Sequence, residues 1–221
     1  HSEHLNEHFR FAPGVTSLAA MPLFHVGGTS YTQVGMHWGA STVLLREVQP
    51  GAMFQAIGAG ATRLFLVPAV VAGVLAGGDA AIAAFSKLEC FAYGASPMPL
   101  PMLRKALDTW PGIEFSQVYG MTEFGGVVTS LSPAAHRDAD HPERLTSAGT
   151  PLDGVEVRVV DPTTLQDVEA GTTGELWFRT DQVMTGYLGN PKATAETITP
   201  DGWLRTGDLG RVDDGGFVNV L

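Results

Sequence analysis

The feature that most constrains the fold is an alternation, over the first part of the chain, of short apolar runs with stretches of helical periodicity. The apolar runs are rich in β-forming residues, which is typical of buried strands; they cover residues 15–21, 42–45, 63–67, 90–93 and 114–118. Apolar residues at helical spacing lie between them, at 28–38, 51–58, 69–75 and 100–110. Strands and helices that take turns predict a mostly parallel sheet with flanking helices, an α/β fold. Ligands of such sheets bind beyond the carboxyl ends of the strands, so we expect a site in the loops after Met21, Val67, Tyr93 and Val118.

The pattern changes after a polar segment at residues 133–144, whose His, Asp and Pro residues predict an exposed loop. From about Gly149 onward, residues 154–160, 174–179 and 217–221 alternate between apolar and polar types and are separated by Pro and Gly turns. This alternation predicts a small antiparallel, β-barrel-like subdomain. We therefore expect an α/β subdomain over residues 1–148 and a β-rich subdomain over residues 149–221.

Composition excludes several classes of function. The net charge is −10 and only 16% of the residues are charged, so no basic surface is expected that could hold nucleic acid or anionic lipid. The single cysteine, Cys90, excludes a disulfide framework and suits a reducing, cytoplasmic location. No apolar stretch approaches the ~20 residues of a membrane-spanning helix, and we expect no transmembrane segment.

Two strand-end loops are rich in glycine, proline and small residues. In the first, His25 lies between an aromatic residue and a pair of glycines, where its ring can gate a pocket; alternatively, it only caps the next helix. In the second, Gly94, Ala95 and Ser96 would let a flat ligand approach the backbone. The following Pro97 would start a helix whose N–H groups face the site. By itself this loop could equally be a plain strand-to-helix turn.

A third cluster places Tyr119, Gly120, Met121, Thr122 and Glu123 directly after a buried strand. These are the parts that a nucleotide site needs. The tyrosine ring can stack on a purine, the threonine hydroxyl can bond a phosphate, and the glutamate can bind Mg²⁺ through oxygen. The alternative is an acidic helix start that Thr122 caps.

A fourth cluster, residues 202–210, contains Asp208 between two glycines. A buried carboxylate there could accept hydrogen bonds from both hydroxyls of a ribose. Its alternative is a turn aspartate.

In this order, the four clusters resemble the adenylate-forming superfamily of acyl-CoA synthetases, peptide-synthetase adenylation domains and luciferases. Residues 174–177 (Gly-Glu-Leu-Trp) and 184–194 (Met-x-Gly-Tyr-x-x-x-Pro-x-Ala-Thr) match a further signature of that superfamily. The resemblance implies a two-step ligase. A carboxylate attacks the α-phosphate of ATP to give acyl-AMP and pyrophosphate, and a thiol, usually coenzyme A, then takes the acyl group.

The resemblance also implies roles for individual residues. Thr122 and Glu123 would be catalytic, with Glu123 as the Mg²⁺ ligand. The expected nucleotide-binding residues are Gly94, Ala95, Ser96, Tyr119, Gly120, Met121, Thr122 and, for the ribose, Asp208. The expected walls of the acyl pocket are His25, Val26, Gly28, Val67, Pro68, Phe124, Gly125 and Gly126. Because these walls are mostly apolar or small, they suit an uncharged acyl tail, and we expect a fatty or aryl carboxylic acid.

Within the superfamily, the Phe24–His25 pair favours the CoA-ligase branch. Two alternatives stay open: an acyl-AMP ligase or amino-acid adenylation domain that loads a carrier protein, and a non-catalytic module that binds nucleotide or a partner. None of Lys87, Lys105 and Lys192 follows a glycine-rich phosphate loop of the kind the superfamily has, and the sequence stops short of the superfamily's C-terminal lysine domain. We therefore expect a central fragment that is inactive alone.

One further pattern is weak. His1, His4 and His8 share helical spacing, but without a fourth ligand a polar helix start is favoured over a metal site.

Overall fold

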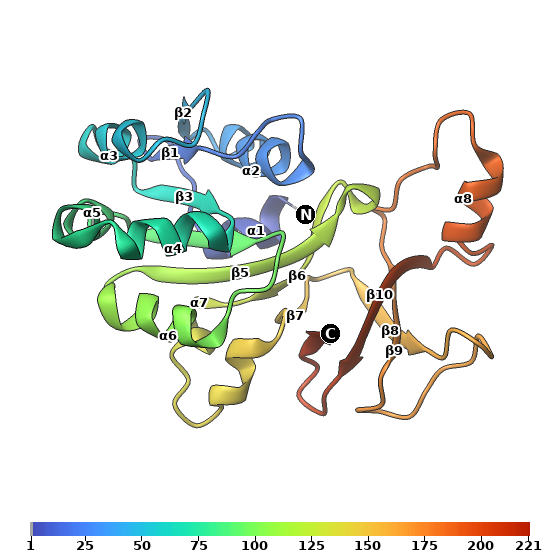
Figure 1. The fold of residues 1–221 in the computed structure, drawn as a ribbon. Helices are drawn as coiled ribbons and strands as arrows, with labels where there is room; N and C mark the ends of the chain where they lie inside the picture. The colour runs from blue at the N-terminus through green and yellow to red at the C-terminus, as the bar shows by residue number, and fades with distance from the viewer. Residues whose placement is uncertain (1) are drawn as a thin grey trace.

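The computed structural model describes residues 2–221 and contains two β-sheets (Figure 1). The larger sheet has seven strands: β1 (Thr16–Ala19), β2 (Ser41–Leu44), β3 (Arg63–Leu66), β4 (Cys90–Gly94), β5 (Glu114–Met121), β6 (Gly126–Leu131) and β7 (Thr150–Pro151). Their order is β2-β1-β3-β4-β5-β6-β7. The first five strands are parallel, whereas β6 and β7 are antiparallel to their neighbours. The predicted mostly parallel sheet is confirmed.

Helices cover both faces of this sheet. They are α1 (Ser2–Phe9), α2 (Val26–His37), α3 (Pro50–Gly58), α4 (Pro68–Ala76), α5 (Gly78–Phe85) and α6 (Leu100–Thr109), followed by the short α7 (Pro133–His136) and η2 (Pro142–Thr146). Successive residues of β3 face opposite sides: Leu64 and Leu66 pack with α3 to α6, and Phe65 packs with α1 and α2. Because both faces of the sheet are covered, residues 64–66 of β3 are all apolar.

The second sheet is antiparallel, in the order β11-β10-β9-β8, and curls into a half-barrel. Its strands are β8 (Glu156–Val160), β9 (Gly174–Arg179), β10 (Leu204–Val212) and β11 (Val218–Val220), and α8 (Pro191–Thr197) lies between β9 and β10. The predicted β-rich part is confirmed. The change of sheet comes after β7, a few residues beyond the predicted division at residue 148.

The two sheets share a hydrophobic core. Phe124, which precedes β6, and Val128 of β6 pack with Leu176, Phe178 and Leu204 of the curled sheet. The Phe124 and Phe178 rings meet edge to face at 5.8 Å between centroids. The β5–β6 hairpin therefore joins one sheet to the other.

The polar segment at residues 133–144 is mostly exposed, as the sequence predicts, but it is not a plain loop. It contains α7 and part of η2, and His136 is only 4% exposed. The His136 Nδ1 lies 2.8 Å from the Ser132 carbonyl oxygen, so Nδ1 carries the hydrogen and Nε2 accepts from the Tyr93 hydroxyl, also at 2.8 Å. Burial lowers the pKa of His136 to about 4. This histidine is a neutral core residue.

Two strand predictions also need correction. Residues 42–45 were expected to be buried, but β2 pairs only with β1 at the edge of the sheet, and Leu44 is 57% exposed. The strand expected to end at Val118 continues to Met121, because β6 pairs with it.

Candidate active site

The parallel strands bring the predicted loops to one edge of the larger sheet. β1 lies between β2 and β3, so β2 is added on one side of β1 and the later strands are added on the other side. Such a switch point opens a crevice at the carboxyl ends of the strands. His25 heads α2 after β1, Val67 follows β3, Ala95 follows β4, and the 3-10 helix η1 (Thr122–Phe124) follows β5.

An apolar cavity of about 70 Å³ lies between the α1–α2 layer and the sheet. Four predicted residues line it: Val26, Ala95, Gly120 and Gly126. Sequence reasoning missed the other lining residues, which are Leu5, Phe9, Gly27, Ser30, Tyr31, Phe65, Val118 and Val127. The centroid of the Tyr31 ring lies 5.6 Å from that of Phe9 and 6.0 Å from that of Phe65. These aromatic side chains form part of the cavity wall.

Other predicted pocket residues lie elsewhere. Gly28 is buried, and a Cβ there would come within 2.3 Å of the Pro22 carbonyl oxygen, so α2 needs a glycine to approach that loop. Val67 and Pro68 form the start of α4. Phe124, at 1% exposure, belongs to the core shared by the two sheets. Gly125 has a φ of +66° and ends η1. None of these lies on the cavity wall.

His25 is exposed and precedes α2 without a side-chain cap, so the capping alternative is not supported. Its ring lies 4.7 Å from the ring of Phe24, which is 85% exposed. Gly94 is buried, whereas Ala95 and Ser96 are exposed. Ala95 has a φ of +63°, a conformation that is uncommon for a residue with a Cβ and often marks a functional loop.

A hydrogen bond joins the third and fourth clusters. The Tyr119 hydroxyl donates to Asp208 Oδ2 at 2.6 Å across 89 residues of sequence. Burial and the neighbouring Asp208 carboxylate raise the pKa of Tyr119, so the phenol stays protonated. Asp208 lies on a bulge of β10 rather than in a turn. Within residues 2–221, Oδ1 of Asp208 receives no side-chain hydrogen bond and can accept from a ligand.

Glu123 of η1 is held by the second signature segment. The Tyr187 hydroxyl donates to Glu123 Oε1 at 2.8 Å, and the Met184 N–H donates to the Glu123 carbonyl oxygen at 2.7 Å. The segment is itself fixed, since the Tyr187 N–H donates to Thr194 Oγ1 at 2.9 Å and the Asn190 side chain caps α8. The sequence identified this segment, but not its contact with Glu123.

No group of three metal-binding side chains lies together in residues 2–221. Glu123 would thus supply a single carboxylate, which fits Mg²⁺, because this ion usually takes one or two carboxylates together with substrate phosphates. His4 of the weak histidine pattern pairs with Asp153 at 3.5 Å instead, and His1 lies outside the described residues. No helix among the described residues has the length and apolar character needed to cross a membrane.

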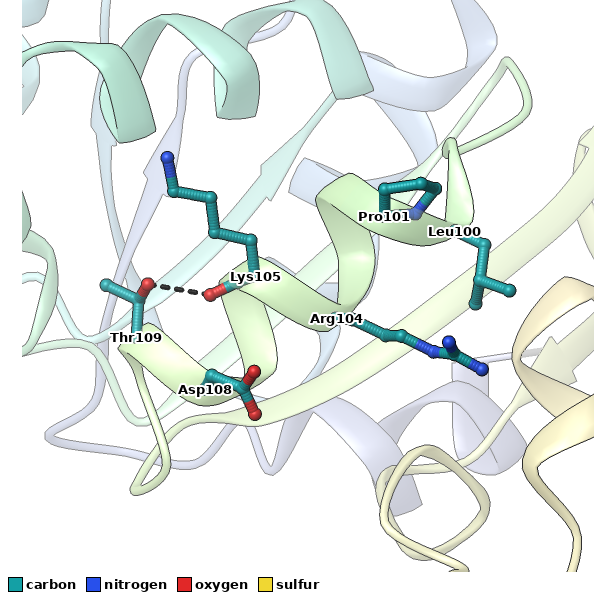
Figure 2. A pocket seen from close by; sticks show the side chains of 6 residues that line it. All are labelled: Leu100, Pro101, Arg104, Lys105, Asp108 and Thr109. Carbon is teal, nitrogen blue, oxygen red and sulfur yellow. Dashed lines mark hydrogen bonds between the residues drawn. The ribbon is translucent and has the colours of Figure 1, made fainter.

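A larger hollow lies elsewhere, on the outside of α6 (Figure 2). It measures about 540 Å³ and is lined by Leu100, Pro101, Arg104, Lys105, Asp108 and Thr109. The Arg104 and Lys105 side chains extend in opposite directions, and no predicted site residue is present. An open depression along one helix cannot surround a ligand, so the smaller cavity at the strand ends is the better candidate.

Known proteins resemble this chain over nearly its whole length. A 4-coumarate–CoA ligase-like protein of Oryza sativa is 32% identical over 210 residues, which is 95% of this chain and 34% of the relative. The peroxisomal OPC-8:0-CoA ligase 1 of Arabidopsis thaliana is 31% identical over 92% of this chain and 37% of its own length. A fatty acid–[acyl-carrier-protein] ligase of Streptomyces coeruleorubidus is 33% identical over 94% of this chain and 39% of its own length. The chain thus spans little more than a third of these relatives.

Solved structures also resemble this chain over its whole length. An amide bond synthetase from Marinactinospora thermotolerans matches the whole chain with a TM-score of 0.87 and 29% identity, over 43% of its own length. The o-succinylbenzoate coenzyme A synthetase of Bacillus subtilis, in complex with AMP, matches with a TM-score of 0.83 and 29% identity, also over 43% of its length. A sequence model of AMP-binding enzymes matches residues 1–188. The chain belongs to the AMP-binding enzyme family.

Proposed function

We propose that the protein is an ATP-dependent carboxylate–CoA ligase that forms an acyl adenylate and then a thioester. The observation that carries this proposal is the Tyr119–Asp208 hydrogen bond; the residues on either side of Tyr119 in β5, Val118 and Gly120, line the apolar cavity. The hydrogen bond brings together an aromatic ring and a carboxylate from motifs 89 residues apart, which supports a nucleotide site there.

In the nucleotide half, the ring of Tyr119 stacks on adenine, and Asp208 accepts from the ribose hydroxyls. The exposed backbone of Ala95 and Ser96, next to Gly94, borders the base, and Met121 lies at the end of the same strand as Tyr119. Thr122 is exposed at the start of η1, where its hydroxyl can bond a phosphate.

Glu123 is proposed as the Mg²⁺ ligand. Bound there, the ion would offset negative charge that develops on the phosphates. The hydrogen bond from Tyr187 to Oε1 fixes the direction in which the carboxylate points. Catalysis at such a site consists of placement and charge stabilisation, so no nucleophilic side chain is required.

In the acyl half, Val26, Gly120 and Gly126 bound the tail of the acid, and His25 lies at the head of α2 close to Val26. The lining contains no charged side chain, so an uncharged fatty or aryl group suits it. The small volume favours a short or flat tail.

Coenzyme A is the proposed acceptor, because several of the relatives bear the name CoA ligase. A carrier-protein ligase and an amide bond synthetase are comparably similar, so loading of a carrier protein is the competing function. We also propose a cytoplasmic location. It suits the free Cys90, a thiol that burial keeps protonated by raising its pKa to about 11.

The test is product analysis with the full-length protein. It is incubated with ATP, Mg²⁺ and a panel of short, aromatic and long-chain acids, with free coenzyme A or with a carrier protein, and pyrophosphate and thioester are measured. We expect acid-dependent pyrophosphate release and an acyl-CoA product. Release without any acid dependence would contradict the proposal. The 221 residues alone, in which no lysine follows a glycine-rich phosphate loop, are expected to give none.

A further inference from the structure

We propose that Glu175 is a positioning residue of the nucleotide site: its carboxylate holds the bulge of β10 that presents Asp208 to Tyr119. The inference rests on the proposed function, in which Asp208 binds the ribose. It assigns a role to the glutamate of the Gly174–Trp177 segment, which the mechanism above leaves unused.

The bulge is a local break in the pairing of β9 with β10. Arg205 pairs with Trp177 and Leu209 pairs with Glu175, so residues 206–208 lie opposite Leu176 alone. Gly207 has a φ of +76°, which favours glycine at this point. The extra residues redirect the strand locally, as bulges next to active sites commonly do, and Asp208 reaches the Tyr119 hydroxyl.

Glu175 holds this bulge from the neighbouring strand. Its Oε1 accepts from the Gly207 N–H at 3.0 Å, and its Oε2 accepts from the indole N–H of Trp177 at 2.8 Å. Trp177 is a rigid anchor: it is only 2% exposed, and the guanidinium groups of Arg158 and Arg205 each lie 4.7 Å from its ring. One carboxylate therefore connects a fixed ring to the residue next to Asp208.

Thr206 supplies a second attachment. Its hydroxyl donates to the Leu176 carbonyl at 2.8 Å and accepts from the Asp208 N–H at 3.0 Å. Thr206, Gly207 and Asp208 are thus each held by a hydrogen bond, and the backbone leading to the Asp208 carboxylate is fixed. Losing the Glu175 acceptor would free the Gly207 N–H and let the bulge sample other conformations. Ligand affinity would fall, because binding would then have to reorder Asp208.

The experiment measures the affinity of the full-length protein for ATP and for 2′,3′-dideoxy-ATP. The variants are Glu175→Ala, Glu175→Gln, Asp208→Ala and the Glu175→Ala/Asp208→Ala pair. Glu156→Ala is the matched control, because Glu156 also hydrogen-bonds a neighbour in the curled sheet, Arg179, but does not contact the bulge.

We expect Glu175→Ala to weaken ATP binding about tenfold, the effect of losing one hydrogen bond to a charged group, with little change for the dideoxy analogue. Glu175→Gln, which keeps one acceptor, should fall between this variant and the wild type. Glu156→Ala should bind both nucleotides normally. In the Asp208→Ala background, Glu175→Ala should have no further effect, because the two residues act through one contact.

Equal losses for both nucleotides, or losses that add in the double variant, would overturn the positioning role. If Glu175→Ala does not fold, the affinities for ATP and for 2′,3′-dideoxy-ATP are compared in Glu175→Gln instead. A ratio of these two affinities equal to that of the wild type would overturn the role. An Asp208→Ala variant with normal ATP affinity would instead remove the ribose role of Asp208, and with it part of the proposed function.

Discussion

The two sheets present residues to the candidate site in different ways. The seven-stranded sheet contributes the carboxyl ends of parallel strands, where Ala95, just after β4, and Gly120, near the end of β5, are exposed. The curled sheet contributes a carboxylate from within a strand, on the bulge that carries Asp208. A strand-end loop follows from topology alone, whereas a bulge depends on side chains of the neighbouring strand. Substitutions in the neighbouring strand β9 should therefore affect the site through the bulge.

The largest expected effect concerns the stability of the parallel sheet in acid. The pKa of His136 is about 4 in the folded protein and 6.5 ordinarily. As the pH falls, the His136 side chain takes up a proton at a higher pH in the unfolded chain than in the folded protein. The free energy of unfolding therefore has its full value above pH 6.5 and decreases as the pH falls towards 4. The loss is about 3 kcal/mol, from the two pKa values. Urea unfolding between pH 4 and 7 measures it. His136→Gln should flatten this dependence, and His141→Gln, an exposed control, should leave it intact. An unchanged slope in His136→Gln would contradict the assignment.

The next effect concerns the curled sheet. Asp208→Ala should weaken ATP binding on the order of 10²-fold, because a charged hydrogen-bond acceptor is lost. Asp213→Ala and Asp214→Ala are controls in the turn after β10 and should bind ATP normally. The ribose role requires a much smaller loss for 2′,3′-dideoxy-ATP than for ATP. Equal losses for the two nucleotides would make Asp208 a structural residue.

A Glu123→Ala variant tests η1, the segment between β5 and β6 in the hairpin that links the two sheets. Glu123→Ala should lower kcat by roughly ten- to fiftyfold while ATP affinity changes little, because the charge it organises grows in the transition state. Steady-state kinetics across a Mg²⁺ titration measures this effect. Glu143→Ala, at an exposed position in η2, is the control. Near-normal turnover with an unchanged Mg²⁺ dependence would reassign Glu123 to structure.

The smallest effect concerns the acyl cavity. A Cβ on Gly27 would lie 3.0 Å from Cε1 of Phe65, so Gly27→Ala should narrow the cavity. We expect KM to rise about fivefold for bulky acids and to stay constant for the shortest acid; this is the lower end, ~1 kcal/mol, of what one methylene is worth in a pocket. Gly51→Ala, where a Cβ meets no atom, is the control. A uniform change for all acids would place the acyl group elsewhere.

The parallel sheet was predictable because its central strands are buried on both faces and give apolar runs, as at Phe65 and its neighbours. β10 was not predicted from the sequence, because its polar residues between 205 and 208 and its glycines are typical of a loop. The helix α7 was missed because a polar segment can still bury one residue, here His136, when a partner such as Tyr93 satisfies it. The motif residues were identified from sequence, but their mutual contacts, such as Tyr187 with Glu123, depend on the tertiary fold.

The core shared by Phe124, Val128 and Phe178 has a consequence for how the molecule unfolds. Two sheets with separate cores could melt one after the other, and each could be moved to another protein as a unit. Here a cut between β7 and β8 would leave an apolar surface on both halves, so neither half is expected to be stable alone. The sheets should melt in a single cooperative transition, and hydrogen exchange in β6 and β9 should report the same opening free energy.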